Sequence, residues 1–297
     1  MKRLLFIDIM RIVGIIFVVL QHLSTAPFLF QNLDQYHFLL NLLPTIYVDY
    51  RFFGIFLFIF ASGCSLAISD QPKTLSDAIN FYKKRVMRIY PIFWVALFFG
   101  GILMPWTLQN FKTPFDYVRV ISGFQVFFQT TAQGTWGVNV AFWFIGLIVS
   151  LYLLYPIVSV AICKCPHKSI VSTLVISIIS RMIMLYYFPQ FISGFDWFPL
   201  CRLFEFSLGI YIIQIGLYPR FTSNSVVAFF GVLSFYIYLV QVPIMYLTNY
   251  QNIGILLFIG TTLLFAIIFY AFDNVLHSSL SHQKLLARAK NKFLIQS

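Results

Sequence analysis

Long apolar segments alternate with short polar ones along almost the whole chain. Eight of these segments have about 17–25 residues, which is the length that an α-helix needs to cross a bilayer. We therefore predict an all-α fold, a polytopic transmembrane bundle of about eight spans, with nine or ten as an open alternative. The predicted spans are 5–25, 46–68, 90–107, 138–162, 169–188, 199–217, 227–248 and 252–276.

The stretch 113–131 is more polar than the eight predicted spans. Pro114 is its second residue, and Asp116 and Arg119 follow within its first turns. Charged side chains are costly in the hydrocarbon layer. We therefore predict a short interfacial or re-entrant helix here rather than a span.

The overall composition is that of a membrane protein. Of the 297 residues, 60% are hydrophobic and only 10% are charged, and the mean hydropathy is +0.85. Soluble domains carry about 25% charged residues. The net charge of +11 would suggest nucleic-acid binding in a soluble protein. Here most of the cations fall in loops on one side of the predicted bundle, so we expect no nucleic-acid partner.

The positions of Lys and Arg predict the orientation of the chain. With the N-terminus in the cytoplasm, the inner segments carry fourteen of these residues, and the outer loops carry two, Lys112 and Arg119. Cytoplasmic loops of membrane proteins are enriched in Lys and Arg. We therefore predict a multi-pass protein of the plasma membrane with both termini inside. A single domain, residues 1–276, would be followed by a short basic cytoplasmic tail, residues 277–297.

Several common catalytic motifs are missing from the sequence. There is no glycine-rich phosphate loop, no Gly-x-Ser-x-Gly elbow and no His-Glu-x-x-His motif, which disfavours an ATPase, a serine hydrolase and a zinc protease. The four cysteines are scattered, and Cys163 and Cys165 are too closely spaced for a zinc site. We expect no metal and no permanently bound cofactor.

Three ionisable residues lie within the first predicted span. On a helix, Arg11 and His22 point within about 20° of one another, and Asp8 lies about 60° from Arg11. Because ionisable groups in a span face the protein interior or a wet cavity, we expect one inward polar stripe. Histidine is the side chain best suited to accept a proton near neutral pH. The alternative for His22 is a buried histidine bonded to a backbone carbonyl.

A basic cluster precedes the third predicted span. Arg85 and Arg88 share one helix face, and guanidinium groups suit phosphate oxygens. The alternative is a positive-inside signal, which accounts fully for Lys83 and Lys84.

A second pair of charged residues lies at the start of the sixth predicted span. Glu205 is the only glutamate of the chain, three residues after Arg202. A buried structural pair is the first interpretation of these two residues, and a site is the second.

Six segments in sequence order carry a resemblance to a known family. The first is Phe6-Ile-Asp8-Ile-Met-Arg11 running on to His22. The others are Phe58-Ile-Phe60-Ala-Ser62-Gly63, Arg85-Val-Met-Arg88-Ile-Tyr-Pro91, Trp143-Phe144 with Tyr152-Leu-Leu-Tyr155-Pro156, Arg202-Leu-Phe-Glu205-Phe, and Ser234-Phe-Tyr236-Ile-Tyr238-Leu-Val-Gln241-Val-Pro243. Together they resemble the acyltransferase-3 family of integral-membrane acyltransferases.

The chain also departs from the pattern of that family. The family often places a carboxylate in the helix that corresponds to Trp143–Tyr155, where this chain has Gly146–Ser150. Gln241 takes the place of the usual histidine of the last segment. Eight predicted spans stand against about ten in the family, and the missing pair would fall between Gly209 and Val226.

The resemblance implies an enzyme that moves an acetyl or other short acyl group. The donor would be cytoplasmic acyl-CoA, and the acceptor a hydroxyl of a cell-surface or lipid-linked glycan. His22, Arg11 and Asp8 would be catalytic, with His22 as general base or as carrier of the acyl group. Lys84, Arg85 and Arg88 would bind acyl-CoA. The cavity that takes the acceptor would be lined by Arg202, Glu205, Tyr238 and Ser62. Membrane lipid is a further expected partner, and the oligomeric state stays open.

The competing hypothesis is a non-catalytic transport or scaffold component of glycan assembly, because polar stripes also line transport paths.

Overall fold

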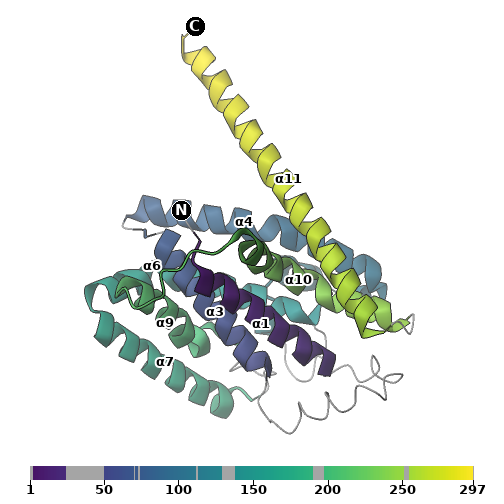
Figure 1. Ribbon diagram of the computed structural model, residues 1–297, viewed down its shortest axis with the longest axis horizontal. Coiled ribbons are helices and arrows are strands. Elements are labelled where there is room, and N and C mark those ends of the chain that lie inside the picture. Colours follow the sequence, from purple (N-terminus) through teal and green to yellow (C-terminus); the bar gives the residue numbers. More distant parts are fainter. Residues whose placement is uncertain are drawn as a thin grey trace.

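The computed structural model describes residues 3–24, 50–69, 71–72, 74–111, 113–128, 138–189, 197–250 and 254–296 (Figure 1). The regular structure in these ranges is helical apart from one isolated bridge between Leu4 and Thr222. The predicted all-α class is therefore confirmed for the described chain. The longer helices are α1 (Leu5–Ser24), α3 (Tyr50–Ser69), α4 (Leu75–Leu103), α6 (Trp143–Lys164), α7 (Pro166–Tyr187), α9 (Leu203–Gln214), α10 (Ser225–Tyr250) and α11 (Ile255–Gln296).

Each of the eight predicted spans corresponds to one of these helices. Six of the described helices, α1, α4, α6, α7, α10 and α11, are long and apolar enough to cross a membrane, and α3 contributes a shorter apolar stretch, Phe53–Ser69. Half of the apolar window of α6 and of α10 is buried, against 22% in α7 and α11. The centre of the bundle is therefore built on α6 and α10, while α7 and α11 lie at its edges (Figure 1).

Helix α9 is shorter than the span predicted at 199–217. A 3₁₀ turn, η6 (Pro199–Arg202), precedes it, and Gly216 follows it with a φ of +75°. That left-handed conformation favours glycine and stops helices. Twelve residues rise only about 18 Å, which is less than the thickness of the hydrocarbon layer. Helix α9 packs closely on α3. Gly63 of α3 and Gly209 of α9 make this close contact, since a Cβ on either would meet a carbonyl oxygen of the other helix.

The polar stretch after α4 forms the predicted short helix. This helix, α5 (Pro114–Ile121), has a capping box in which the Thr113 side chain accepts from the Asp116 backbone N–H. It lies between two 3₁₀ turns, η3 (Pro105–Asn110) and η4 (Gln125–Phe128), and a third, η5 (Val140–Phe142), leads into α6. Tyr90 Oη donates to the Ser122 carbonyl at 2.8 Å, which ties the end of α5 to α4.

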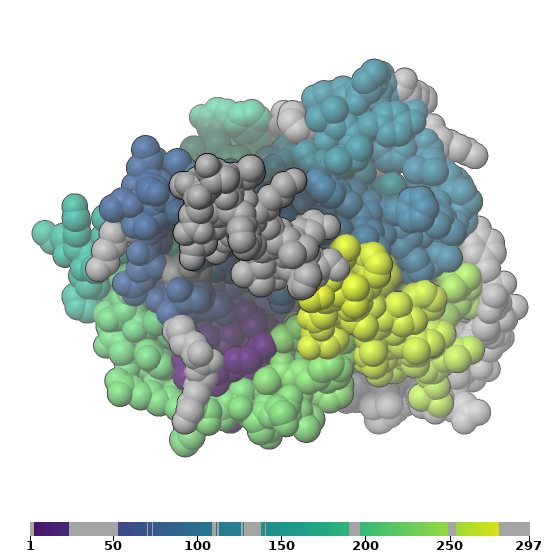
Figure 2. All heavy atoms as spheres, turned by 90° about the horizontal axis from the view of Figure 1, so that it is seen from above, coloured from purple at the N-terminus to yellow at the C-terminus, as the bar shows by residue number. Residues whose placement is uncertain are grey.

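Helix α1 packs between α3 and α10. The backbones of α1 and α3 approach at Gly14 and Gly54, where a Cβ on Gly54 would lie 2.8 Å from the Gly14 carbonyl oxygen. Ahead of α1, the Leu5 N–H donates to the Phe221 carbonyl and the Ser223 N–H donates to the Arg3 carbonyl, both at 2.9 Å. Viewed from above, the N-terminal residues lie between α3 and the segment that joins α9 to α10 (Figure 2). These contacts fix the start of α1 inside the bundle.

The predicted boundary between the domain and a tail at residue 277 falls inside α11. This helix runs without interruption from Ile255 to Gln296, and its apolar part ends at Ser278. Its second half projects from the bundle (Figure 1). The basic residues of the C-terminal segment therefore follow the last apolar turns on one continuous helix.

Candidate functional site

A cavity of about 230 Å³ lies where α1, α3, α4, α6 and α10 meet, and we name it the arginine cavity. Four guanidinium groups and several hydroxyl groups line it, and apolar side chains complete its wall. The polar lining residues are Arg3, Arg11, Arg85, Arg88, Ser62, Ser234, Tyr152, Tyr236 and Tyr238.

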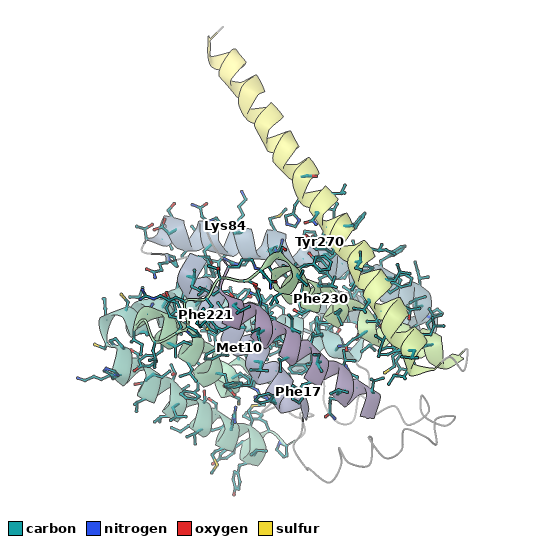
Figure 3. All side chains as sticks on the ribbon, viewed as in Figure 1. Met10, Phe17, Lys84, Phe221, Phe230 and Tyr270 are labelled. Carbon is teal, nitrogen blue, oxygen red and sulfur yellow. The ribbon has the colours of Figure 1, made fainter. Side chains whose placement is uncertain are left out.

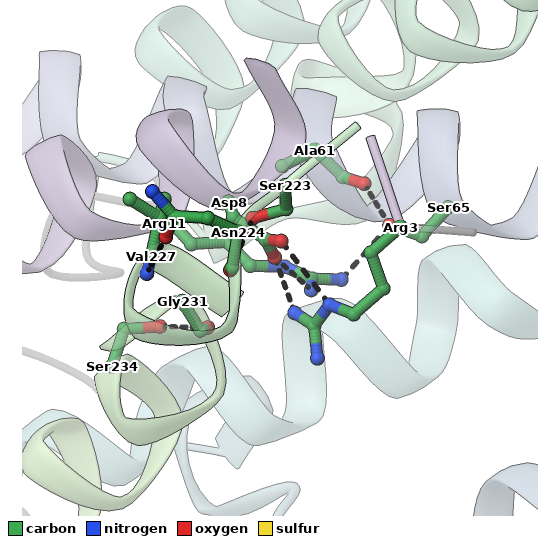
Figure 4. Close-up of polar contacts among 10 residues, drawn as sticks. All are labelled: Arg3, Asp8, Arg11, Ala61, Ser65, Ser223, Asn224, Val227, Gly231 and Ser234. Carbon is green, nitrogen blue, oxygen red and sulfur yellow. Dashed lines mark hydrogen bonds and ion pairs between the residues drawn. The ribbon is translucent and has the colours of Figure 1, made fainter. Parts of the chain in front are cut away.

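Asp8 holds two of these arginines in place (Figure 4). It is 1% exposed, and its carboxylate accepts from the Nε and an Nη atom of Arg3. Nη1 of Arg11 lies 3.6 Å from the same carboxylate, as the spacing of three residues predicted. Helix α10 presses on this group through Gly231, where a Cβ would lie 2.7 Å from Asp8 Oδ1. Asp8 is thus a buried anchor rather than a group that reaches the cavity itself.

Arg11 is also fixed from the side of α3. Its Nη2 donates to Ser65 Oγ at 2.8 Å, and Ser65 Oγ donates in turn to the Ala61 carbonyl at 2.6 Å (Figure 4). A hydroxyl and a carboxylate therefore orient one guanidinium group from two helices. This double hold pre-organises Arg11 at the wall of the arginine cavity.

The two arginines of α4 reach the arginine cavity from the opposite side. The Arg85 guanidinium carbon lies 5.3 Å from the centre of the Phe81 ring, within the range of a cation–π contact. Nη1 of Arg88 lies 3.9 Å from Asp273 Oδ2, and Asp273 is 1% exposed. Each of these two guanidinium groups is therefore held from behind by a buried side chain.

Lys84 does not line the arginine cavity. It lines an open cavity of about 760 Å³, the α4 cavity, with Lys83, Arg88 and His277. It projects from α4 on the side of the bundle where α11 leaves (Figure 3). Arg88 lines both cavities and is the residue that connects them.

His22 lines a small separate space of about 30 Å³, the histidine pocket, with Gln21, Trp143 and six other residues. Three of these residues, Phe58, Phe144 and Tyr238, also line the arginine cavity. Tyr238 Oη donates to the Ala141 carbonyl at 2.5 Å, which fixes its ring at the boundary. The two spaces are therefore neighbours that share one aromatic wall.

Arg202 and Glu205 lie away from both spaces. Glu205 Oε1 accepts from Arg181 at 2.6 Å and from Arg202 at 3.2 Å, and neither Arg202 nor Glu205 lines the arginine cavity or the histidine pocket. Arg181 also donates through Nε to the Cys201 carbonyl at 3.0 Å. The three charges thus connect α7 to α9, which is the structural interpretation of the pair.

Most of the chain matches the model of a known sequence family. A family of acyltransferase domains, acyltransferase-3, matches residues 4–223. The chain belongs to the acyltransferase-3 family. No curated protein and no solved structure gives a significant match.

The matched region contains five of the six segments that carried the resemblance, and the sixth, from Ser234 to Pro243, lies beyond it. As a member of the acyltransferase-3 family with several apolar helices, the protein is a multi-pass membrane acyltransferase. The structure brings five of the predicted site residues, Arg11, Arg85, Arg88, Ser62 and Tyr238, to the arginine cavity. His22 lies in the neighbouring histidine pocket, Asp8 is buried behind Arg11, and Lys84 lines the α4 cavity.

Sequence reasoning missed three residues in or behind the wall of the arginine cavity. Arg3 was counted only as a topological charge, although it lies five residues before Asp8. Asp273 is a lone carboxylate within the last predicted span, and the cost of such a group in lipid is the signal that would have found it. Tyr236 donates through Oη to Asp273 Oδ2 at 2.7 Å.

The arrangement as a whole suits a flexible anionic ligand with a small group at its end. Four guanidinium groups against two carboxylates, Asp8 and Asp273, leave a positive cavity wall. The next space is small and holds an imidazole. In the described parts of the chain, no group of three or more His, Cys, Asp or Glu could hold a metal ion.

Proposed function

We propose that the protein transfers an acetyl or other short acyl group from cytoplasmic acyl-CoA to a hydroxyl of a cell-surface or lipid-linked glycan. The observation that carries the proposal is the shared aromatic wall between the arginine cavity and the histidine pocket. A cavity for a phosphate-bearing donor and a pocket with a proton acceptor are the two parts that such a transfer requires.

The donor would bind on the side of the arginines. Guanidinium groups pair with phosphate oxygens through two parallel hydrogen bonds. The nucleotide part of the donor would occupy the α4 cavity with Lys84, and the pantetheine arm would pass Arg88 into the arginine cavity. Arg11 lies about 16 Å from His22 along α1, so its role in this proposal is to bind the donor rather than to act on the acceptor.

The chemical step would take place at the aromatic wall. The His22 imidazole accepts the proton of the acceptor hydroxyl, and the oxygen attacks the thioester carbonyl. The new C–O bond forms as the C–S bond breaks, and CoA leaves as the thiolate, which takes a proton. In the alternative route, His22 first accepts the acyl group itself and passes it to the hydroxyl.

The size of the histidine pocket supports a short acyl group. A water needs about 10–15 Å³ of such space, so the 30 Å³ beside His22 corresponds to about two waters. This fits an acetyl group and is too small for a long acyl chain. By the positive-inside rule the arginines lie toward the cytoplasm, which places His22 toward the outer face, where a glycan acceptor would be met.

The test is mass spectrometry of cell-surface glycans from cells that carry the wild-type gene, no gene, the His22→Ala variant or the Lys168→Ala variant. Lys168 is an exposed residue of α7, and no residue of α7 lines the arginine cavity or the histidine pocket, so it serves as the control. We expect acetylated glycans with the wild type and with Lys168→Ala, and none in the other two. Equal acetylation with His22→Ala, at equal protein level in the membrane, would reject the proposal.

A further inference from the structure

Asp273 is a buried charge that the donor and acceptor roles above leave unused. It belongs to α11, outside the residues 4–223 matched by the family, and it is 1% exposed. An ionisable group in an apolar span is costly, and such groups are usually paired and often have a function. The contacts of Asp273 indicate what its function is.

Three side chains converge on the Asp273 carboxylate. Tyr236 Oη donates to Oδ2 at 2.7 Å, Nη1 of Arg88 lies 3.9 Å from the same oxygen, and Nδ1 of His277 lies 3.2 Å from Oδ1. Tyr236 and Arg88 line the arginine cavity, and Arg88 and His277 line the α4 cavity. The carboxylate therefore lies directly behind the residue that connects the two cavities.

Arg88 needs such a support. Its side chain is 53% exposed, and a long exposed side chain loses conformational entropy when a ligand immobilises it. In the described chain, Asp273 is the one carboxylate within ion-pair distance of Arg88. An arginine that is already oriented loses less freedom when the anion arrives.

We propose that Asp273 is a positioning residue that orients Arg88 toward the phosphates of the acyl donor, with Tyr236 fixing the carboxylate. The arrangement mirrors the opposite wall, where buried Asp8 holds Arg3 and Arg11. Each wall of the arginine cavity thus has a carboxylate behind its cations. This inference rests on the proposed use of acyl-CoA as the donor.

The direction in which Asp273→Asn changes the affinity for acetyl-CoA shows whether Asp273 orients Arg88 or only reduces the positive charge of the cavity. Asp273→Asn keeps an oxygen that can accept from Tyr236 and removes the negative charge. If Asp273 only reduced the positive potential of the cavity, its neutralisation would tighten the binding of an anion. Because it orients Arg88, we expect the Kd for acetyl-CoA to rise by about twofold to tenfold, the equivalent of the side-chain ordering that is lost.

A double-mutant cycle tests the inference in the detergent-purified full-length protein, with acetyl-CoA binding followed by calorimetry. Asp273→Asn is expected to weaken binding in the wild-type background and to have no further effect in the Arg88→Ala background, because the residue it orients is gone. Equal effects in both backgrounds, or tighter binding by Asp273→Asn, would overturn the inference.

Two further outcomes keep the experiment decisive. If Asp273→Asn does not fold, Tyr236→Phe takes its place; it removes only the hydroxyl that fixes the carboxylate and is expected to weaken binding in the same direction, again only when Arg88 is present. An effect of Tyr236→Phe that persists in Arg88→Ala would overturn the inference alone. If neither the wild-type protein nor Lys168→Ala binds acetyl-CoA, both the proposed function and this inference are overturned.

Discussion

Tyr238 and His22 line the same small pocket, and Tyr238 also lines the arginine cavity. The tyrosine is therefore part of the boundary between the two spaces, and in the proposed function the acyl group meets His22 at this boundary. Its hydroxyl donates to the Ala141 carbonyl at 2.5 Å, which holds α10 against the start of α6. This hydrogen bond fixes the position of the Tyr238 ring at the boundary between the two spaces.

Tyr238→Phe is expected to lower the stability of the protein. The variant keeps the ring but leaves the buried Ala141 carbonyl without this donor, which costs about 1–3 kcal/mol. Thermal unfolding of the detergent-purified variant should show a lower Tm than the wild type, while the affinity for acetyl-CoA stays within about twofold, since the guanidinium groups are untouched. An unchanged Tm would contradict the structural role assigned to this hydrogen bond.

His22→Ala is expected to separate turnover from donor binding. General acid–base groups contribute about 10²- to 10⁴-fold to rates, so acyl transfer should fall by that factor. The Kd for acetyl-CoA should stay near the wild-type value, because the imidazole lies about 16 Å from Arg11 along α1. Parallel losses of binding and turnover would instead indicate a structural role for His22.

Replacement of both Arg85 and Arg88 by Ala is expected to weaken the binding of acetyl-CoA by more than about tenfold, since hydrogen bonds to charged groups contribute about 1.5–3 kcal/mol each. Acetyl-pantetheine carries no phosphates, so its weaker binding should be the same in the double variant and the wild type. Lys168→Ala is the matched control for the loss of an exposed cation. A double variant that loses affinity for both ligands equally would show that these arginines do not bind phosphate.

Gly63→Ala is expected to destabilise the contact of α3 with α9. A Cβ at this position would meet the Phe206 carbonyl oxygen, which cannot move without shifting α9, and such overpacking costs about 1–3 kcal/mol. Gly260→Ala in α11 is the control, because nothing lies within 4 Å of a Cβ there. The control should unfold at or slightly above the wild-type temperature, since Ala favours helices over Gly. Equal unfolding temperatures of the two variants would contradict the close packing of α3 on α9.

The sequence predicts the helices well because bilayer length and apolar content are local properties. It overestimates α9, since the segment 199–217 is largely apolar and the early end of the helix depends on the left-handed Gly216. The charged residues of the stretch 113–131 predict a short helix there, and the structure has it at Pro114–Ile121.

The site is predictable only in part, because its pieces come from distant helices. The sequence indicates Arg11, Arg85 and Arg88 as site candidates, because of their spacing and their position in or beside apolar segments. The pairing of Arg88 with Asp273 joins residues far apart in sequence, and no local pattern indicates it. The sequence favours a structural pair for Arg202 and Glu205, whereas the resemblance implies that they line the acceptor cavity. Glu205 accepts hydrogen bonds from both Arg181 and Arg202, which connects α7 to α9 as the structural interpretation requires.

The most direct test of the central claim is a cryo-electron microscopy structure of the full-length protein with a non-hydrolysable acetyl-CoA analogue. The account predicts phosphates within hydrogen-bond distance of Arg85 and Arg88, and the acetyl group at the wall of Phe58, Phe144 and Tyr238, directed toward His22. An analogue whose phosphates lie away from these arginines, or whose acetyl group lies on the far side of the bundle from His22, would contradict it.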